Sequence, residues 1–330
     1  MCIRDRSLSY GQIESLDIEI VRDAFGVPHI YGKTDADSAY GLAWVHSEDD
    51  FMTIQKAYLA GNQLLSSYLA NDGIIVDFLT QFIESKKTVD VLFSTLSDDF
   101  IKILEAYSQG INRYAELHPE EVLVKDLFPI TPKKMLNYSF LQLFISNGAD
   151  QLVSKIISNN TVDLSNLGIN EDIQGSNTFA FNNNKTKNGE TYLAINTHQP
   201  LDGPNSWYEV HLNSEEGTNI LGATFAGAPC ILTGVNEHLA WTHTVNYPDK
   251  ADLFKLKMHN SKKNIYLVDN KEYKLEKYKA KLKYRIFGVN IGIKKTYFKS
   301  IFGPTLKNKS GYYSVRTPSL YNIKALEQWW

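Results

Sequence analysis

Gly175-Ser176-Asn177 is the stretch of this sequence whose residue types could form a reactive chain end. A serine hydroxyl is a weak nucleophile at neutral pH and needs a base within hydrogen-bond reach. Cleavage of the peptide bond before Ser176 would supply that base, because a free α-amino group has a pKa of about 8 and can accept the hydroxyl proton. The small Gly175 and the polar segment before it suit such a cleavage. Gly, Ser and Asn are also common turn residues, so the stretch by itself favours an ordinary turn.

The other nucleophilic and metal-ligating side chains form no motif. Cys2 and Cys230 lie far apart and make neither a disulfide framework nor a Cys-x-x-Cys metal pattern. We expect Cys230, which apolar residues flank, to be a small buried hydrophobic side chain. His211, His238 and His243 fall in one strand-rich region, but their spacings match no zinc pattern. Isolated strand histidines of this kind are more often hydrogen-bonded structural residues, and for His243 a place lining a site is the open alternative.

The composition is that of an ordinary globular protein. The chain has 330 residues, 43% of them hydrophobic and 22% charged, and a formal net charge of −3, which fits one large domain or two of usual size. The balanced charge gives no electrostatic reason to expect nucleic acid as a partner. No run of about 18 apolar residues occurs, so no membrane span is predicted. Two lysine-rich stretches, 271–285 and 294–308, are interleaved with tyrosines and hydrophobic residues and are typical of solvated strand faces.

The sequence pattern changes once along the chain, from mostly helical before the reactive residues to strand-rich after them. Two short strands are predicted around the turn Gly26-Val27-Pro28. Residues 35–160 are then mostly helical, with apolar residues at three- and four-residue spacing. Ser97 is predicted to be an N-cap, and Pro132 suits a first helical turn.

A polar, asparagine-rich segment, residues 154–175, is interpreted as a spacer. It separates a mostly helical part, 13–153, from a strand-rich part, 176–330, whose short segments are punctuated by turn residues. One of these turns predicts a hairpin around Asp269-Asn270. Helices followed by strands, with a polar break between them, predict the α+β class.

Both ends of the sequence have unusual features. We expect residues 1–12 to be a non-native leader, because the charged run Arg4-Asp5-Arg6 stands where a signal peptide would be apolar. At the other end, Ser319 is a helix start signal, and apolar residues follow near helical spacing up to Trp330 without a cap. The sequence is therefore expected to be a fragment, truncated at both ends and without its export signal.

Longer motifs carry a resemblance to a known family. They include GSNTFAF, TYLAINTHQPLDGPNSWYEVHL and NILGATFAGAPCILTGVNEHLAWTHTVN downstream, and RDAFGVPHIYGKTDADSAYGLAWVHSEDDF and YSQGINRY upstream. From about Ile18 to its end, the chain resembles the penicillin acylase (penicillin amidase, acyl-homoserine lactone acylase) family of N-terminal nucleophile hydrolases. The resemblance implies a four-layer αββα core, incomplete in a truncated chain. It also implies cleavage into a helical α chain and a strand-rich β chain.

The resemblance assigns catalytic residues by position. Ser176 matches the family's nucleophile, which autocatalytic cleavage after Gly175 would release. His198, in NTHQPL, matches a histidine near the nucleophile. Val245, in WTHTVN, matches the residue whose backbone N–H forms half of the oxyanion hole. The family's second oxyanion donor is an asparagine further along than this sequence reaches.

A structural calcium site is a further implication of the resemblance. Asp249 and Asp252 align with calcium-binding aspartates of the family, and Ala251 would offer its carbonyl oxygen. Hard oxygen ligands of this kind suit calcium. The family's glutamate ligand from the helical part has no match in QLVSKIISNN, and two acidic residues in a loop are usually only solvated.

The sequence departs from the family at several points. The basic D-R after the early histidine is replaced by EDDF, residues 48–51, and a G-R element by GNQ. Phe302 stands where the family has the histidine of H-G-P, and NTHQ lacks the aspartate of N-D-P-H. These departures indicate a divergent member with altered packing or specificity.

The implied function is that of a self-processing N-terminal serine amidohydrolase. Its substrate would be a small N-acyl compound with an apolar acyl group, such as an acyl-homoserine lactone or a β-lactam side-chain amide. We expect Trp207, Leu232 and His243 to line the acyl pocket, and catalysis to need no cofactor. The expected partners are the substrate and the protein's own α and β chains, in the periplasm or outside the cell.

Two other functions are open. A non-catalytic binding relative could keep the fold without cleaving itself, although the retained Gly175-Ser176, His198 and WTHTV argue against it. A conventional Ser-His-Asp hydrolase finds no support, because the sequence contains no G-x-S-x-G elbow.

Overall fold

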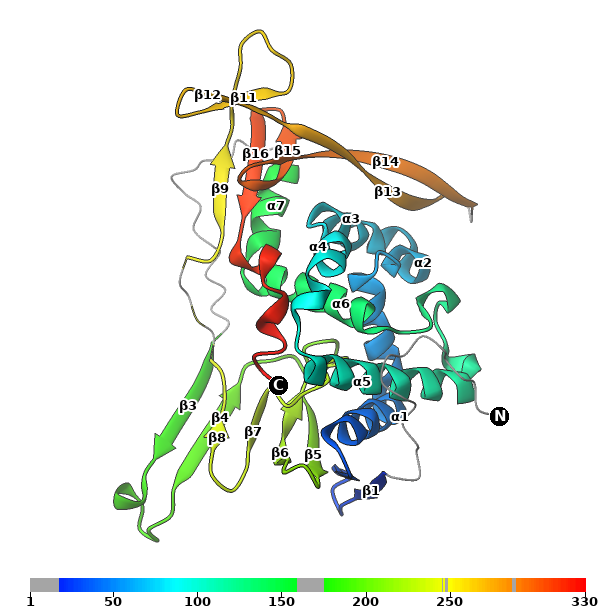
Figure 1. The fold of residues 1–330 in the computed structure, drawn as a ribbon, viewed down its shortest axis with the longest axis vertical. Coiled ribbons are helices and arrows are strands. Elements are labelled where there is room, and N and C mark those ends of the chain that lie inside the picture. Colours follow the sequence, from blue (N-terminus) through cyan, green and yellow to red (C-terminus); the bar gives the residue numbers. More distant parts are fainter. Residues whose placement is uncertain (1–17, 159–174, 245, 247–248, 287–288) are drawn as a thin grey trace.

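The computed structural model describes residues 18–158, 175–244, 246, 249–286 and 289–330. Helices occupy the first part of the chain and strands most of the second (Figure 1). The predicted α+β class is confirmed. The predicted spacer, 154–175, begins too early, because residues 154–157 belong to helix α7 (Ala149–Ile157) and Ile156 is buried in a core cluster. Residues 159–174 of the spacer and the leader 1–12 lie outside the described residues.

Seven α-helices follow the two first strands in the described chain, as the periodicity of residues 35–160 predicted. They are α1 (Asp35–Gly61), α2 (Leu65–Leu69), α3 (Ile74–Phe82), α4 (Ser85–Leu92), α5 (Asp98–Leu117), α6 (Pro132–Ser146) and α7 (Ala149–Ile157). The predicted cap of α5 is confirmed, since the Ser97 side chain accepts a hydrogen bond from the Phe100 N–H. Pro132 occupies the first turn of α6 behind the N-cap Thr131.

The largest sheet of the described chain has six strands, which pair in the order β1-β2-β5-β6-β7-β8. Their bounds are β1 (Glu19–Arg22), β2 (Pro28–Gly32), β5 (Tyr208–Ser214), β6 (Asn219–Thr224), β7 (Thr233–Val235) and β8 (Ala240–Trp241). All neighbours are antiparallel except β2 and β5, which pair in parallel with His29 opposite His211. The first two strands of the protein therefore complete a sheet made by its second half.

Three smaller sheets complete the strand-rich part. A two-stranded sheet joins β3 (Ser176–Phe181) to β4 (Tyr192–Thr197). A five-stranded sheet contains, in order, β13 (Glu276–Ile286), β14 (Val289–Ser300), β15 (Gly303–Asn308), β16 (Gly311–Arg316) and β9 (Asp252–Lys255). The third contains β10 (Lys257–Met258), β11 (Ile265–Val268) and β12 (Lys271–Lys274). Asp269 and Asn270, which join β11 to β12, both have positive φ, at 49° and 63°, so the predicted hairpin is confirmed.

The main core lies between the six-stranded sheet and helices α1 and α5. Its buried side chains include Leu42 and Tyr58 of α1, Tyr107 of α5 and Val210 of β5. A Cβ added to Gly110 of α5 would lie 2.5 Å from the Tyr40 carbonyl oxygen, so the missing side chain lets α5 approach α1 closely.

A second core packs helices α3, α6 and α7 against the five-stranded sheet. Phe82, Phe144, Tyr313 and Val315 are buried in it. The two cores are interleaved along the chain, because α3 of the second core lies between α1 and α5 of the main core in sequence.

The end of the chain differs from the prediction. In place of the helix expected from Ser319, residues Pro318–Tyr321 and Ile323–Ala325 form two short 3-10 turns. Leu320 packs into the second core and Leu326 into the first. Tertiary burial therefore fixes these apolar side chains without a continuous helix.

Candidate active site

Ser176 is the first residue of β3, and its position is fixed by pairing with β4. Ser176 lies opposite Thr197 in the antiparallel register, which brings the next residue, His198, beside the serine. The backbone N–H of His198 points to Ser176 Oγ, with 3.5 Å between nitrogen and oxygen. The structure thus brings together two of the residues that the sequence selected.

The imidazole of His198 has its own contact in this corner. Its Nε2 atom lies 3.3 Å from Nδ2 of Asn177. An amide nitrogen can only donate, so Asn177 favours the tautomer in which Nε2 accepts and Nδ1 carries the proton. On the other side of the ring, a Cβ added to Gly175 would lie 3.8 Å from His198 Nδ1. The Gly175–Ser176 peptide bond therefore lies next to a histidine that can donate or accept a proton.

The expected oxyanion donor and acyl-pocket residues do not gather around Ser176 in the way that His198 does. Val245, the expected oxyanion donor, lies outside the described residues. Leu232 is 4% exposed and belongs to the main core. Trp207 is partly buried and stacks on Phe225, with 4.1 Å between ring centroids. His243 is exposed, and its ring centroid lies 5.7 Å from that of Trp329.

A cavity of about 370 Å³ is lined by residues of α1, α5 and the six-stranded sheet, and neither Ser176, His198 nor His243 lines it. Ile231, Cys230, Trp241 and Trp329 contribute to its mostly apolar lining. Neither Leu232 nor Trp207 lines it. Burial raises the pKa of the Cys230 thiol to about 12, which agrees with its interpretation as a small buried hydrophobic side chain.

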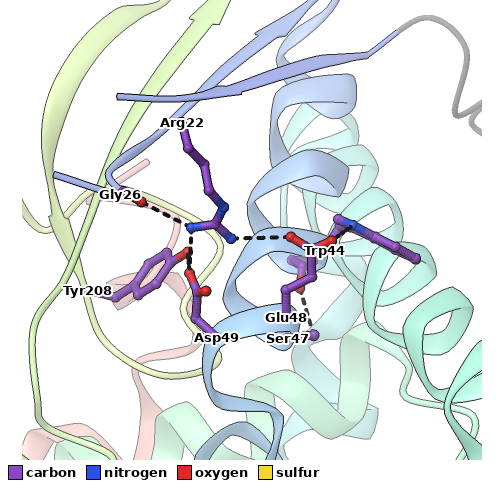
Figure 2. Close-up of polar contacts among 8 residues, drawn as sticks. Arg22, Gly26, Trp44, Ser47, Glu48, Asp49 and Tyr208 are labelled. Atoms are coloured by element: carbon purple, nitrogen blue, oxygen red, sulfur yellow. Dashed lines mark hydrogen bonds and ion pairs between the residues drawn. The ribbon is translucent and has the colours of Figure 1, made fainter. Parts of the chain in front are cut away.

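An ion-pair network holds Tyr208, the residue after Trp207, against α1. Figure 2 shows the Arg22 guanidinium between Asp49, at 2.9 Å, and Glu48, at 3.2 Å, and the Tyr208 hydroxyl donating to the same Asp49 carboxylate. Trp44 Nε1 donates to the other oxygen of Glu48. Partial burial opposes the charge of Arg22, but its hydrogen bonds to Asp49 and Glu48 raise its pKa overall. The acidic EDDF, where the family has a basic D-R, is thus matched by an arginine from β1.

The imidazole of His46, on α1, packs against the ring of Tyr208. The two rings are stacked, 4.0 Å apart and 7° from parallel. His46 is 3% exposed, and its Nδ1 atom is buried without a hydrogen-bond partner in the part of the chain that the structure describes. Burial lowers the pKa of His46 to about 4, although Asp50 and Asp49 oppose the shift. The imidazole is therefore neutral at physiological pH.

The expected calcium ligands lie where β9 begins. Asp252 is the first residue of β9 and pairs with Arg316 of β16, and Ala251 packs against the second core. The start of α7 comes to the same region, because Asn147 donates a hydrogen bond to Thr317, the residue after β16.

Asp150, in the first turn of α7, is a candidate ligand that sequence reasoning missed. Its Oδ1 atom is buried and has no hydrogen-bond partner among the described residues. Burial raises the pKa of this carboxyl. Asp150 stands one residue before the stretch searched for a glutamate. An orphaned carboxylate oxygen in this place fits a hard cation.

Asp150, Asp249 and Asp252 do not form a cluster with ligand atoms within 4.8 Å of one another, whereas one such group does occur among the described residues. His118, Glu120 and Glu121 offer ligand atoms within 4.8 Å of one another. His118 is also stacked on Tyr114, with 4.2 Å between ring centroids. Both glutamates are exposed, and exposed acidic groups are common without a bound ion.

None of the described helices is long and apolar enough to cross a bilayer.

Comparison with known proteins gives consistent results. Residues 17–330 match the family model of penicillin amidase. The acyl-homoserine lactone acylase PvdQ of Pseudomonas fluorescens Pf0-1 is 24% identical over 94% of this chain and 45% of its own length. The acyl-homoserine lactone acylase QuiP of P. fluorescens Pf-5 is 24% identical over 77% of this chain and 37% of its own.

A solved structure, thermostable penicillin G acylase from Alcaligenes faecalis, is 24% identical with a TM-score of 0.33, over 37% of this chain and 22% of its own. The chain spans less than half the length of the curated relatives named above. The family model, in contrast, matches nearly every residue from 17 onward. The chain belongs to the penicillin amidase family.

Proposed function

We propose that this protein is a self-processing N-terminal serine amidohydrolase that hydrolyses the amide bond of an N-acyl substrate. The observation that carries the proposal is the position of Ser176 at the first residue of β3, with the His198 N–H 3.5 Å from its hydroxyl oxygen. Membership of the penicillin amidase family supports it. The relatives named acyl-homoserine lactone acylases support the same reaction class.

The first step is cleavage of the Gly175–Ser176 bond. Ser176 Oγ attacks the Gly175 carbonyl carbon, and an N→O acyl shift gives an ester and frees the α-amine of Ser176. Water then hydrolyses the ester, which leaves a carboxylate on Gly175 and restores the hydroxyl. His198, whose ring lies beside Gly175, is placed to take up and return the proton in these steps.

Substrate hydrolysis uses the same hydroxyl. The free amine of Ser176 takes the hydroxyl proton, directly or through a water, and Oγ attacks the substrate amide carbon. The negative charge on the carbonyl oxygen would be held by the backbone N–H of Val245 and by an asparagine that the family resemblance places beyond residue 330. The leaving amine carries the proton away, and water hydrolyses the acyl-serine ester to release the acid.

The relatives named acyl-homoserine lactone acylases support a proposed substrate class. Acyl-homoserine lactones and related N-acyl compounds with an apolar acyl group are the proposed substrates, with Trp207 and His243 near the acyl group. Since Leu232 is part of the main core, it would act by supporting that wall of the pocket. We propose the periplasm or the cell exterior as the compartment.

A structural calcium ion is proposed at the start of β9. Asp150, Asp249, Asp252 and the carbonyl oxygen of Ala251 would hold it. When bound, the ion would join α7 of the helical part to β9 of the strand-rich part through their oxygen ligands. It takes no part in the acyl transfer.

The experiment that tests the function is an intact-mass measurement on the full-length protein and on its Ser176→Ala variant. Two fragments in the parent, with a new N-terminus at Ser176, and a single uncut chain in the variant are expected. Ser206→Ala is the matched control, because this serine donates its hydroxyl to Gly203 in a turn away from β3. A single uncut mass for well-folded parent protein would contradict the mechanism and favour a non-catalytic binding relative.

A further inference from the structure

The ribbon formed by β13 and β14 concentrates positive charge in a chain that is negative overall. Residues 276–300 contain eight Lys and Arg side chains and one Glu, a net charge of +7, whereas the whole chain carries −3. We call this segment the basic ribbon. Such a segregation creates a local positive potential that the net charge conceals.

The register of the basic ribbon places five of its seven lysines on one face. Lys277, Lys279, Lys281 and Lys283 alternate along β13 and therefore point to the same side. Lys294 of β14 lies directly opposite Lys281. Like charges directly opposite one another destabilise a strand pair. An anionic partner would reduce this repulsion between Lys281 and Lys294.

These charges are available to a partner. Lys277, Lys279, Lys281 and Lys294 are exposed, and none of them makes an ion pair with another described residue. In contrast, Lys299, near the base of the ribbon, is paired with Glu84.

Apart from Glu276, Lys295 and Lys299, the opposite face of the ribbon is mostly apolar, and its side chains change from buried to exposed toward the tip. Near the base, Ala280 and Leu282 are buried against the second core. Four side chains of this face are exposed: Ile293 (40%), directly opposite Leu282, and, closer to the tip, Tyr284 (38%), Ile291 (44%) and Val289 (63%). The ribbon extends across α3 and past α2 (Figure 1).

The base of the ribbon is held firmly. The side-chain amide of Gln81 on α3 donates to the Lys281 carbonyl at 2.8 Å and accepts from the Lys281 N–H at 2.8 Å. This bidentate contact satisfies the outer edge of β13 at that residue. The ribbon therefore projects from a fixed point.

We propose that the basic ribbon docks peripherally on an anionic lipid surface. The aliphatic and tyrosine side chains of the distal half would enter the headgroup region, where Tyr is favoured. The lysines of the other face lie within the distance over which an anionic surface attracts basic residues. A nucleic acid would satisfy the lysines but not the exposed aliphatic side chains, so the combination favours lipid. This inference is independent of the acylase activity.

Co-sedimentation of the full-length protein with vesicles tests the proposal. The vesicles contain phosphatidylcholine alone or mixed with phosphatidylglycerol. We expect binding to the anionic vesicles that weakens as salt is raised. Lys281→Gln combined with Lys294→Gln should lower the partition coefficient about 30-fold. Ile291→Ser with Ile293→Ser should lower it about tenfold.

The control variant combines Lys125→Gln and Lys185→Gln, two exposed lysines outside the ribbon, and should bind as the parent does. Circular dichroism verifies that each variant is folded. Equal loss in the control, or equal binding to neutral vesicles, would overturn the proposal. So would binding to heparin or DNA without binding to vesicles, or a dimer that the ribbon variants dissociate.

Discussion

The backbone nitrogen of His198 lies 3.5 Å from Ser176 Oγ because β3 and β4 pair with Ser176 opposite Thr197. If the register shifted by one residue, His198 would lie beside a different residue of β3, and the side chains of β4 would point to the other face of the sheet. The distance between the two residues therefore depends on the hairpin as a whole. Asn177 then orients the imidazole from the same strand.

Replacement of His198 tests whether its imidazole takes part in the reaction. We expect His198→Ala to lower kcat for amide hydrolysis by roughly 100-fold, the usual contribution of a positioned acid–base group. Release of free amine from an N-acyl substrate is the measurement. His238→Ala, at an exposed position on the loop after β7, is the control and should retain the parent rate. A His198→Ala enzyme with full kcat would restrict the role of His198 to its backbone N–H.

Removal of Arg22 tests the network in Figure 2. Arg22→Gln should lower the free energy of unfolding by roughly 1 kcal/mol, because the partly exposed Glu48 and Asp49 then repel one another. Urea denaturation at low and high salt measures the loss, which should shrink as salt is added. Lys133→Gln removes a single exposed ion pair, with Asp90, and should change stability by less. Equal losses in the two variants would contradict the network.

His46 predicts a pH dependence of stability. Its pKa is about 4 in the folded protein and 6.5 ordinarily, so between these values the unfolded chain binds a proton that the folded chain does not. The free energy of unfolding is therefore highest above pH 6.5 and falls as the pH drops toward 4, by roughly 3 kcal/mol at most. His46→Phe keeps the stack on Tyr208 without the titration, and its unfolding free energy should fall less over this range. Parallel pH profiles of parent and variant would contradict the assignment.

Calcium binding makes a separate prediction. Added calcium should raise the Tm of the parent, and EGTA should reverse the increase, because a ligand that binds only the folded state stabilises it. Asp150→Asn and Asp252→Asn should each abolish the response. Glu120→Gln combined with Glu121→Gln, in the exposed group beside His118, is the control and should respond as the parent does. A response lost only in this control would assign the ion to the exposed group.

Local signals accounted for much of the architecture. The N-cap at Ser97, the proline in the first turn of α6 and the Asp269-Asn270 hairpin depend on residues close together in sequence, and each is observed. Such signals act through hydrogen bonds and backbone conformations within a few residues. The selection of Ser176 and His198 rested on the family resemblance, and their proximity follows from a hairpin of neighbouring strands.

Other features needed the tertiary structure. The pairing of Arg22 with Asp49, the orphaned oxygen of Asp150 and the exposed tip of the basic ribbon join or expose residues that no local pattern relates. The helix expected from Ser319 was wrong because burial of Leu320 and Leu326 in two separate cores outweighed helical periodicity. The sequence by itself determined the class and the order of elements and selected Ser176 as the proposed nucleophile, since these depend on local propensity and motif. Only the packed structure decided which distant charges meet and which apolar side chains stay in water, because burial and Coulomb energies depend on separation in space.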